Sequence, residues 1–219
     1  MSERIVGVYG VGGCGRGVMP LVRAEASRQG LPLDRVVFID DEPPATSVNG
    51  QRVLAYDEFL ALPAESRSVV IAIADGPTRA LIAERCERDG LRFGCVRSGN
   101  AVVMDDVTVG PGAILSPFVT LTSNIRIGRH FQANLYSYVE HDCVIGDFVT
   151  FAPAAKCNGN VMIEDFAYVG AGAVIKQGRA GAPLVIGRGA VVGMGAVVTK
   201  SIPAGSVVVG NPARPIRER

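Results

Sequence analysis

Apolar side chains recur at every sixth position through the second half of the sequence. These positions are Val103, Val109, Leu115, Leu121, Ile127, Ala133, Val139, Ile145, Phe151, Cys157, Ile163, Val169 and Ile175. A second stripe, from Val107 to Ala173, runs four residues further on and is mostly small or apolar. A period of six excludes a helix or an ordinary strand and matches the hexapeptide repeat of a β-helix. We therefore predict a β-helix here, in preference to a β-sandwich of alternating strands.

The repeat also predicts how the β-helix is built. Three hexapeptides make one triangular coil of about eighteen residues, and the register resumes at Ile186, Val192 and Val198. The segment QGRAGAPLV lies just before this point and is rich in Gly and Pro, so we expect a loop over 177–185 that leaves the prism. One flat face of such a prism stays apolar, and closed symmetric assembly would cover it. We expect a homotrimer.

The first 98 residues show a different pattern, in which short apolar runs alternate with helical segments. RIVGVYG predicts a buried strand, GVGGCGRG a glycine turn, and the spacing from Val18 to Arg28 a helix. We expect further strands over 35–39, 52–56, 68–74 and 92–96, and helices near residue 58 and over 77–89. This alternation is typical of an α/β domain, so we predict two domains, residues 1–98 and 99–219.

The glycine turn points to a nucleotide. Gly10, Gly12 and Gly15 fit the G-x-G-x-x-G pattern, in which missing side chains let backbone N–H groups and a helix N-terminus approach phosphate oxygens. Arg16 adds a cation at this turn. Tight packing of a strand against a helix is the alternative reason for the glycines.

Two acids support the same interpretation. Asp40 and Asp41 follow the second strand, where the Rossmann pattern places an acid that hydrogen-bonds a ribose or base; a solvated turn is the alternative. The α/β pattern ends near Ser98, too early for the second half of a dinucleotide site, so we expect no NAD. Cys14 has no nearby histidine to activate its thiol, and we expect it to be a small side chain facing the ligand or the sheet.

Composition narrows the class of protein. The formal charge of +1 without a basic stripe argues against nucleic acid as a partner. No stretch approaches the roughly 18 apolar residues of a membrane span, and a charged start runs directly into a strand, so we expect no membrane insertion.

The cysteines lack metal-ligand spacing, which indicates a reducing cytoplasm and no disulfide. They are Cys14, Cys86, Cys95, Cys143 and Cys157.

The chain has two histidines, which is too few for a three-histidine zinc site, so we expect no metal. His141 follows the inward-facing Val139 by two positions and is flanked by Glu140 and Asp142 in a predicted turn. A neutral imidazole, with an ordinary pKa of about 6.5, accepts a proton from an attacking amine or hydroxyl, and a nearby carboxylate fixes its tautomer. We predict that His141 is catalytic and that His130 is structural.

Four segments together resemble the hexapeptide-repeat sugar acyltransferases that carry a small N-terminal nucleotide-binding domain. They are YGVGGCGRG, SYVEHDCVIGDFV, AAKCNGNVMIEDFAYVGAGAVI and VVVGNPARPI. This group contains sialic acid O-acetyltransferases and N-acetyltransferases of nucleotide-linked 4-amino-6-deoxysugars, and the chain is most similar to those that act on GDP-perosamine. The resemblance covers nearly the whole chain. It implies a Rossmann-like domain followed by a left-handed parallel β-helix, with acetyl-CoA as co-substrate.

The resemblance also implies roles for individual residues. His141 would be the catalytic histidine beside Asp142, helped by Asn134 on the adjoining turn. Acetyl-CoA would lie in a groove between two prisms of a trimer, near the backbone of Gly159, Asn160, Gly170 and Ala171. The nucleotide part of the sugar would be held by Gly12, Gly13, Cys14, Gly15, Arg16, Asp40 and Asp41.

The chain departs from the family pattern at two positions. Many members have a histidine where this chain has Cys14, and a second histidine where it has Thr150. Two other functions stay open. A sugar O-acetyltransferase would need a stronger base, because a hydroxyl hardly ionises at neutral pH. A non-catalytic nucleotide-sensing scaffold would keep the prism only for assembly.

Overall fold

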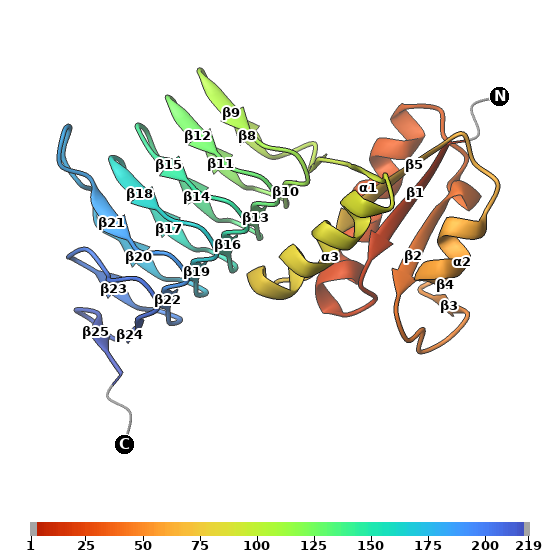
Figure 1. Cartoon of the computed structure of the whole chain (residues 1–219). Helices are drawn as coiled ribbons and strands as arrows, with labels where there is room; N and C mark the ends of the chain where they lie inside the picture. Colours follow the sequence, from red (N-terminus) through yellow and green to blue (C-terminus); the bar gives the residue numbers. More distant parts are fainter. Residues whose placement is uncertain (1–3, 217–219) are drawn as a thin grey trace. The chain divides into compact units, whose positions relative to one another are not determined.

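The computed structural model divides the chain into two compact units, Met1–Val96 and Arg97–Arg219 (Figure 1). It describes residues 4–216, so the charged start at residues 1–3 and the last three residues of the second predicted domain lie outside the described residues. Within residues 4–216, none of the helices combines the length and the apolar character that a membrane span requires.

The first unit is a largely parallel β-sheet with buried central strands. Its strand order is β3-β4-β2-β1-β5-β6, with β3 antiparallel to β4 and the other pairs parallel. The strands are β1 (Arg4–Tyr9), β2 (Val36–Asp40), β3 (Ser47–Val48), β4 (Gln51–Ala55), β5 (Ser66–Ile71) and β6 (Arg92–Phe93). The strands β1, β2 and β5 are apolar runs because helices cover both faces of the sheet.

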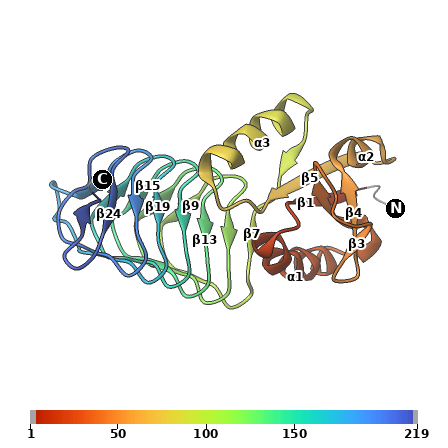
Figure 2. The same ribbon diagram turned by 90° about the horizontal axis from the view of Figure 1, so that it is seen from below.

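The helices divide between the two faces. α1 (Gly13–Arg28) lies on one face and α2 (Tyr56–Ala61) and α3 (Gly76–Arg88) lie on the other, while the short 3-10 helix η1 (Leu33–Arg35) precedes β2 (Figure 2). From β1 the chain moves to β2 on one side of the sheet and later returns to β5 on the other. Ligands of open α/β sheets bind where the strand order reverses in this way, at the carboxyl ends of the strands. The glycine turn after β1 lies at this point.

The structure corrects two sequence predictions in this unit. α1 begins at Gly13 instead of Val18, so the second half of the glycine turn forms the first turn of the helix. The strand expected over 92–96 begins at Arg92 as predicted but is too long, because β6 ends at Phe93 and β7 (Val96–Arg97) pairs in the second unit. Gly94 interrupts the run, and a strand loses packing where glycine has no side chain. The other predicted elements are confirmed within three residues.

The second unit is a triangular prism of short strands. Its sheets have the orders β25-β24-β22-β19-β16-β13-β10-β7, β23-β20-β17-β14-β11-β8 and β21-β18-β15-β12-β9. As far as β24, successive strands belong to different sheets and pair in parallel with strands of the neighbouring coils, as Tyr138 pairs with Lys156. The stacked parallel sheets that the period of six predicts are therefore confirmed.

The strands of the prism are two or three residues long. Their bounds are β8 (Val102–Val103), β9 (Val107–Val109), β10 (Ile114–Leu115), β11 (Thr120–Leu121), β12 (Ile125–Ile127), β13 (Gln132–Ala133), β14 (Tyr138–Val139), β15 (Val144–Ile145), β16 (Thr150–Phe151), β17 (Lys156–Cys157), β18 (Val161–Ile163), β19 (Tyr168–Val169), β20 (Val174–Ile175), β21 (Leu184–Ile186), β22 (Val191–Val192), β23 (Val197–Val198), β24 (Val207–Val209) and β25 (Arg214–Pro215). β25 is antiparallel to β24.

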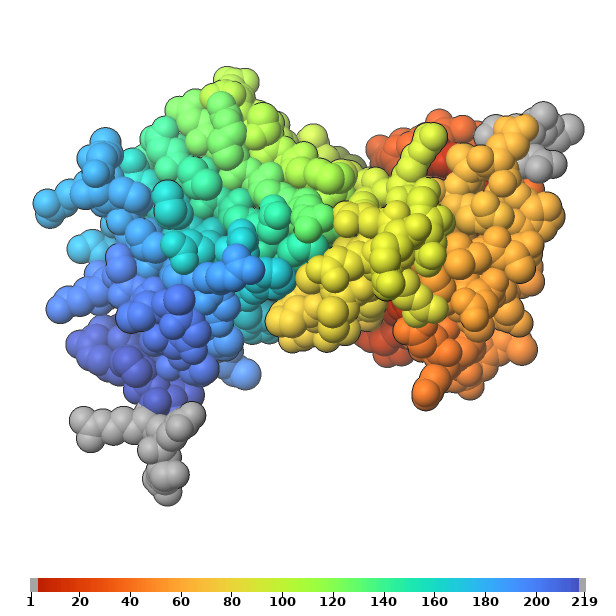
Figure 3. Space-filling view, viewed as in Figure 1, coloured from red at the N-terminus to blue at the C-terminus, as the bar shows by residue number. Residues whose placement is uncertain are grey.

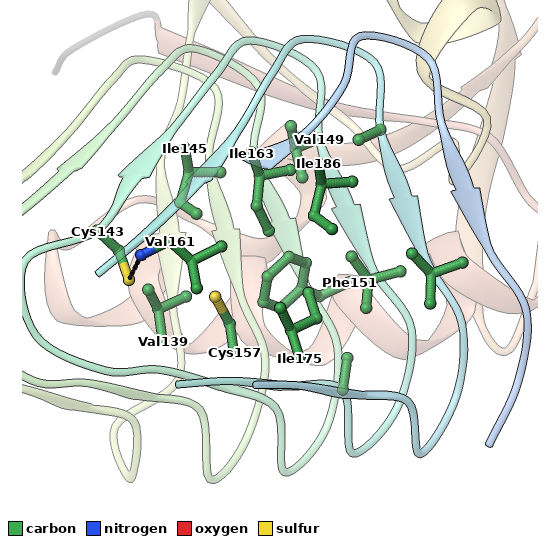
Figure 4. Packing of buried hydrophobic residues seen from close by; sticks show 14 of the residues in the cluster. Val139, Cys143, Ile145, Val149, Phe151, Cys157, Val161, Ile163, Ile175 and Ile186 are labelled. Atoms are coloured by element: carbon green, nitrogen blue, oxygen red, sulfur yellow. Dashed lines mark hydrogen bonds between the residues drawn. The ribbon is translucent and has the colours of Figure 1, made fainter. Parts of the chain in front are cut away.

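The two predicted stripes fill the prism with one continuous core (Figure 4). Phe131 and Phe151 pack edge to face in this core, with ring centroids 5.3 Å apart. Val103 and Val109 are only partly buried, because the stack of coils begins there. The expected loop is also present: the chain leaves the prism after β20, protrudes, and rejoins it at β21 (Figure 3).

The corners of the prism share one backbone conformation. Every sixth residue from Asp106 to Gly172 has a positive φ, between 52° and 76°. One row of these residues turns the chain from the β14 sheet to the β15 sheet, and we name it the Asx corner: Asp106, Asn124, Asp142 and Asn160. A second row turns the chain from the β13 sheet to the β14 sheet, and we name it the Tyr136 corner: Phe118, Tyr136, Ala154 and Gly172.

The third row contains Gly112, His130, Phe148 and Phe166. Asn and Asp adopt this left-handed backbone more readily than bulkier residues, and the aromatic residues gain stacking in return. Phe118 stacks on Tyr136, and His130 stacks on Phe148 with the rings 4.9 Å apart. His130 is fully buried, which agrees with a structural role.

Candidate active site

His141 stands at the Asx corner, between β14 and β15 and directly before Asp142. Its neighbours Val139 and Cys143 point into the core and are buried (Figure 4). The imidazole between them points outward and has 51% of its side-chain surface exposed. Inward and outward side chains alternate around this corner, and the outward imidazole of His141 is open to a ligand.

Asp142 binds the imidazole of His141. The Nδ1 atom of His141 lies 2.7 Å from Asp142 Oδ2, and Asn124 donates its side-chain N–H to Asp142 Oδ1 at 3.1 Å. The hydrogen bond to Asp142 is the main cause that raises the pKa of His141, and the same bond, followed by that from Asn124, lowers the pKa of Asp142. Because a carboxylate only accepts, Nδ1 carries the proton and Nε2 of the neutral ring is an acceptor.

The next coil lies directly against His141. The Asn160 N–H donates to the carbonyl oxygen of His141 at 2.9 Å. Gly159 occupies the position of His141 one coil later, and a Cβ atom placed on it would lie 2.5 Å from both Cε1 and Nε2 of the imidazole. The ring edge that carries the acceptor nitrogen therefore lies over Gly159. Two residues expected to contact acetyl-CoA thus share the corner with His141.

The other predicted residues of the prism lie elsewhere in the same chain. Asn134 is near the Tyr136 corner, at the opposite end of β14 from His141, and its Oδ1 accepts the N–H of Leu135 at 2.7 Å. Gly170 and Ala171 are on that corner as well. The structure therefore places His141 and Asp142 together, whereas Asn134 is at a different corner and its role stays a prediction.

Gly170 has a packing reason to be glycine. A Cβ atom there would lie 2.6 Å from the backbone nitrogen of Met194 in the next coil. Its N–H donates to Val192, and the Ala171 carbonyl accepts the Gly195 N–H. The coils approach closely at this corner and its backbone groups are partly used within the prism.

In the first unit, the glycines of the turn divide into two kinds. Cβ atoms on Gly12 and Gly13 would meet nothing within 4 Å, so a ligand can approach their backbone. A Cβ atom on Gly15 would lie 1.8 Å from the carbonyl oxygen of Gly10, so Gly15 is required for α1 to pack against β1. Arg16 donates to the carbonyl of Val11 at 3.2 Å. The packing reason therefore applies to Gly15, whereas nucleotide binding at Gly12 and Gly13 stays a prediction.

The two acids after β2 make different contacts. Asp40 accepts backbone N–H groups from Val11, at 3.3 Å, and from Glu42, at 3.2 Å, so it braces the glycine turn. Asp41 accepts from the Tyr9 hydroxyl at 2.8 Å and from Arg85 at 2.7 Å. Asp41 is thus part of an ion-pair network at the carboxyl edge of the sheet.

Cys14 and Arg79 are close enough for the charge of Arg79 to act on the thiol. Burial raises the pKa of Cys14, which keeps the thiol protonated and argues against a nucleophile. Arg79 is fully buried, donates to the carbonyls of Ile73 and Ala74, and has its pKa lowered to about 10 by burial. Sequence reasoning missed Arg79, because nothing in the pattern distinguishes a buried arginine from an exposed one on a helix.

Two further observations concern cofactors and thiols. Among residues 4–216, no group of three or more His, Cys, Asp or Glu side chains could hold a metal ion. All five cysteines are free thiols.

Sequence reasoning also missed Asn124, which donates to Asp142. The coil period could have found it, because Asn124 lies one coil before Asp142.

Comparison with known proteins gives close relatives over the full length. No family model matches the chain. It is 48% identical to the GDP-perosamine N-acetyltransferase of Escherichia coli O157:H7, over 97% of this chain and 96% of that protein. The structure of WeeI from Acinetobacter baumannii AYE is 55% identical with a TM-score of 0.95, covering 97% and 100% of the two chains. PerB from Caulobacter crescentus, solved with CoA and GDP-perosamine, is 25% identical with a TM-score of 0.84, covering 97% of each chain.

Proposed function

The chain belongs to the hexapeptide-repeat acetyltransferase family of GDP-perosamine N-acetyltransferase, and from this premise we propose that it acetylates the amino group of a nucleotide-linked 4-amino-6-deoxysugar, GDP-perosamine above all. The donor is acetyl-CoA. The observation that carries the proposal is the paired His141 and Asp142 at an open corner of the prism. The sequence identity of 48% to a GDP-perosamine N-acetyltransferase, over 97% of the chain, supports the choice of sugar.

We further infer that the two units divide the substrates. The first, predicted as residues 1–98, would be a Rossmann-like domain that holds the nucleotide at the glycine turn, where Gly12 and Gly13 are open and the strand order reverses. The second, residues 99–219, would be a left-handed β-helix that binds acetyl-CoA and supplies His141. The free thiols and the acetyl-CoA donor suit a cytoplasmic enzyme.

In the proposed reaction the sugar amine attacks the carbonyl carbon of the acetyl thioester directly. A C–N bond forms, the C–S bond breaks, and CoA leaves as thiolate. The amine proton passes to Nε2 of His141, which gives it to the CoA thiolate after the C–S bond has broken. No covalent enzyme intermediate is needed.

His141 contributes one part of the rate. Holding two bound substrates in line, with a backbone N–H at the developing oxyanion, supplies much of the acceleration. A positioned base adds about 10²–10⁴-fold. Because the pKa of His141 is raised, the base is fully available only above its ordinary titration range. An amine that is already partly neutral needs the base less.

The separate corners favour a shared site in a homotrimer. A groove between two prisms would bring the Tyr136 corner of one copy, with Asn134, Gly170 and Ala171, beside the Asx corner of the next. Gly159 and Asn160 line that second corner next to His141. In this arrangement Asn134 and His141 would act together although they lie apart in one chain.

The test is release of CoA thiol from acetyl-CoA by the purified protein, offered GDP-perosamine and a UDP-linked 4-amino-6-deoxysugar in parallel. We expect turnover with GDP-perosamine and slower or absent turnover with the UDP sugar. Preference for the UDP sugar would overturn the nucleotide assignment.

The product separates the rival functions. An amide survives mild alkali, whereas the ester made by an O-acetyltransferase of the sialic acid type is hydrolysed. Nucleotide binding without CoA binding, and without thiol release from acetyl-CoA with any sugar as acceptor, would identify a non-catalytic scaffold. Either result would overturn the proposed N-acetyl transfer.

A further inference from the structure

We propose that Gly159, in the next coil, and Cys143, in the same coil, are positioning residues that hold the imidazole of His141 in place. Their part in catalysis rests on the proposed function, whereas their effect on the imidazole does not. The inference starts from the coil period, which places His141 and Gly159 at equivalent positions of successive coils and leaves the ring lying over a residue without a side chain.

The space above Gly159 is filled by the imidazole itself. A Cβ atom at this position would lie 2.5 Å from Cε1 and Nε2 and 2.9 Å from Nδ1 of His141. Carbon and nitrogen atoms do not approach this closely without a bond, so the ring and an alanine methyl group cannot both keep these positions. His141 is half exposed and free to rotate outward. A Gly159→Ala chain would therefore fold, but its imidazole would leave Asp142.

Cys143 ties the same two turns together from inside the prism. Its buried sulfur accepts the Val161 N–H at 3.4 Å (Figure 4) and lies 3.5 Å from the carbonyl oxygen of His141 and 3.4 Å from that of Asn158. A thiol can donate one hydrogen bond through its S–H and accept another at its sulfur. The Cys143 thiol therefore links the turn of His141 to the turn that contains Gly159. This one side chain therefore contacts the backbone of both turns, in addition to the Asn160 N–H bond to the carbonyl oxygen of His141, and its thiol also interacts with that of Cys157.

The readout is the titration of His141 itself. The groups whose charge acts on its imidazole are Asp142, Glu140 and Cys143, and the contact with Asp142 has the largest effect. Only two histidines are present in the chain, and His130 is fully buried, so proton NMR of the tag-free protein can follow His141 without substrates.

For Gly159→Ala we expect the pKa of His141 to fall toward its ordinary value and kcat for thiol release to fall at least about tenfold, which is the loss of part of a base worth about 10²–10⁴-fold. The matched control is Gly99→Ala in the same unit, where a Cβ atom meets nothing within 4 Å. It should leave both quantities unchanged. A Gly159→Ala protein that titrates as the wild type would overturn the proposal, even if acetyl-CoA binding were weaker.

Cys143 is tested by a pair of replacements. Cys143→Val removes the hydrogen-bond donor and acceptor and should lower both the pKa of His141 and kcat. Cys143→Ser keeps a donor and an acceptor, so the pKa of His141 and kcat should stay close to those of the wild type. Ile186→Val is the control for a change in core packing, because Ile186 is equally buried in the core and has no hydrogen-bonding side-chain group. If Cys143→Val fails to fold, Cys143→Ser still decides. A Cys143→Ser protein in which the pKa of His141 has fallen to its ordinary value would overturn the linking role.

The two proposals fail in different ways. A shifted His141 titration in the variants, without thiol release from acetyl-CoA by the wild type with any nucleotide sugar as acceptor, would overturn the proposed function and leave the positioning role. Release of CoA thiol from acetyl-CoA in the presence of GDP-perosamine, with an unshifted His141 titration in every variant, would overturn the positioning role and leave the proposed function.

Discussion

Replacing Gly15 by alanine should damage the nucleotide site by moving the N-terminus of α1. The new Cβ atom would start 1.8 Å from the carbonyl oxygen of Gly10, so the helix must retreat from β1 by more than an ångström to restore a normal contact. Overpacking of this kind costs about 1–3 kcal/mol. In a domain of about 100 residues, each kcal/mol corresponds to roughly 4–8 °C in Tm.

The same displacement withdraws backbone N–H groups from a bound phosphate. A hydrogen bond to a charged group contributes about 1.5–3 kcal/mol, and 1.4 kcal/mol is tenfold in affinity. We therefore expect isothermal titration calorimetry to show GDP binding weakened by about 10–100-fold in Gly15→Ala. Thermal unfolding of the same sample gives the stability loss independently.

Gly17→Ala is the matched control on the same helix. A Cβ atom at Gly17 would meet nothing within 4 Å, and alanine in a helix is more stable than glycine by about 0.5–1 kcal/mol. This variant should bind GDP as the wild type does and unfold at a slightly higher temperature. Unchanged GDP affinity and Tm in Gly15→Ala would refute the proposed link between helix packing and phosphate binding.

Three further changes test other parts of the molecule. Asp142→Asn removes the main cause of the raised pKa of His141, so the acid limb of the kcat/KM profile should move to lower pH; an unmoved limb would contradict this origin. Phe151→Ala empties a fully buried site beside Phe131 and should cost about 3–5 kcal/mol in urea unfolding, whereas a loss below about 1 kcal/mol would mean that the core collapses around it. Co-expression of His141→Ala with Asn134→Ala chains should restore part of the activity that each variant has lost, if one site uses both copies; mixtures no more active than their parts would exclude the shared groove.

The prism could be predicted from the sequence because its rule is local. Inward positions are apolar in nearly every coil, so the period of six is visible without knowledge of the partners. The corner conformation could not be predicted, since Phe118, Phe148 and Phe166 adopt a positive φ that bulky residues avoid. They do so because the coils stack their rings or fix their backbone, which is a property of the assembled prism.

The site was predictable in part. His141 and Asp142 are adjacent in sequence, so their contact follows from the turn that contains both. The contact of His141 with Gly159 needs the coil period, because the two residues are eighteen positions apart and meet only when the coils stack. Arg79 shows the opposite limit, since its burial depends on the loop after β5 and on no pattern in its own helix.

Thiol release from acetyl-CoA, measured across pH for the wild type and for His141→Ala with GDP-perosamine, tests the role of the paired histidine most directly. We expect the variant to be slower by about 10²-fold or more near neutral pH, to remain measurably active, and to approach the wild type at higher pH, where the amine is already neutral. A loss of no more than about threefold at every pH would contradict a catalytic role for His141, because a positioned base contributes far more than this.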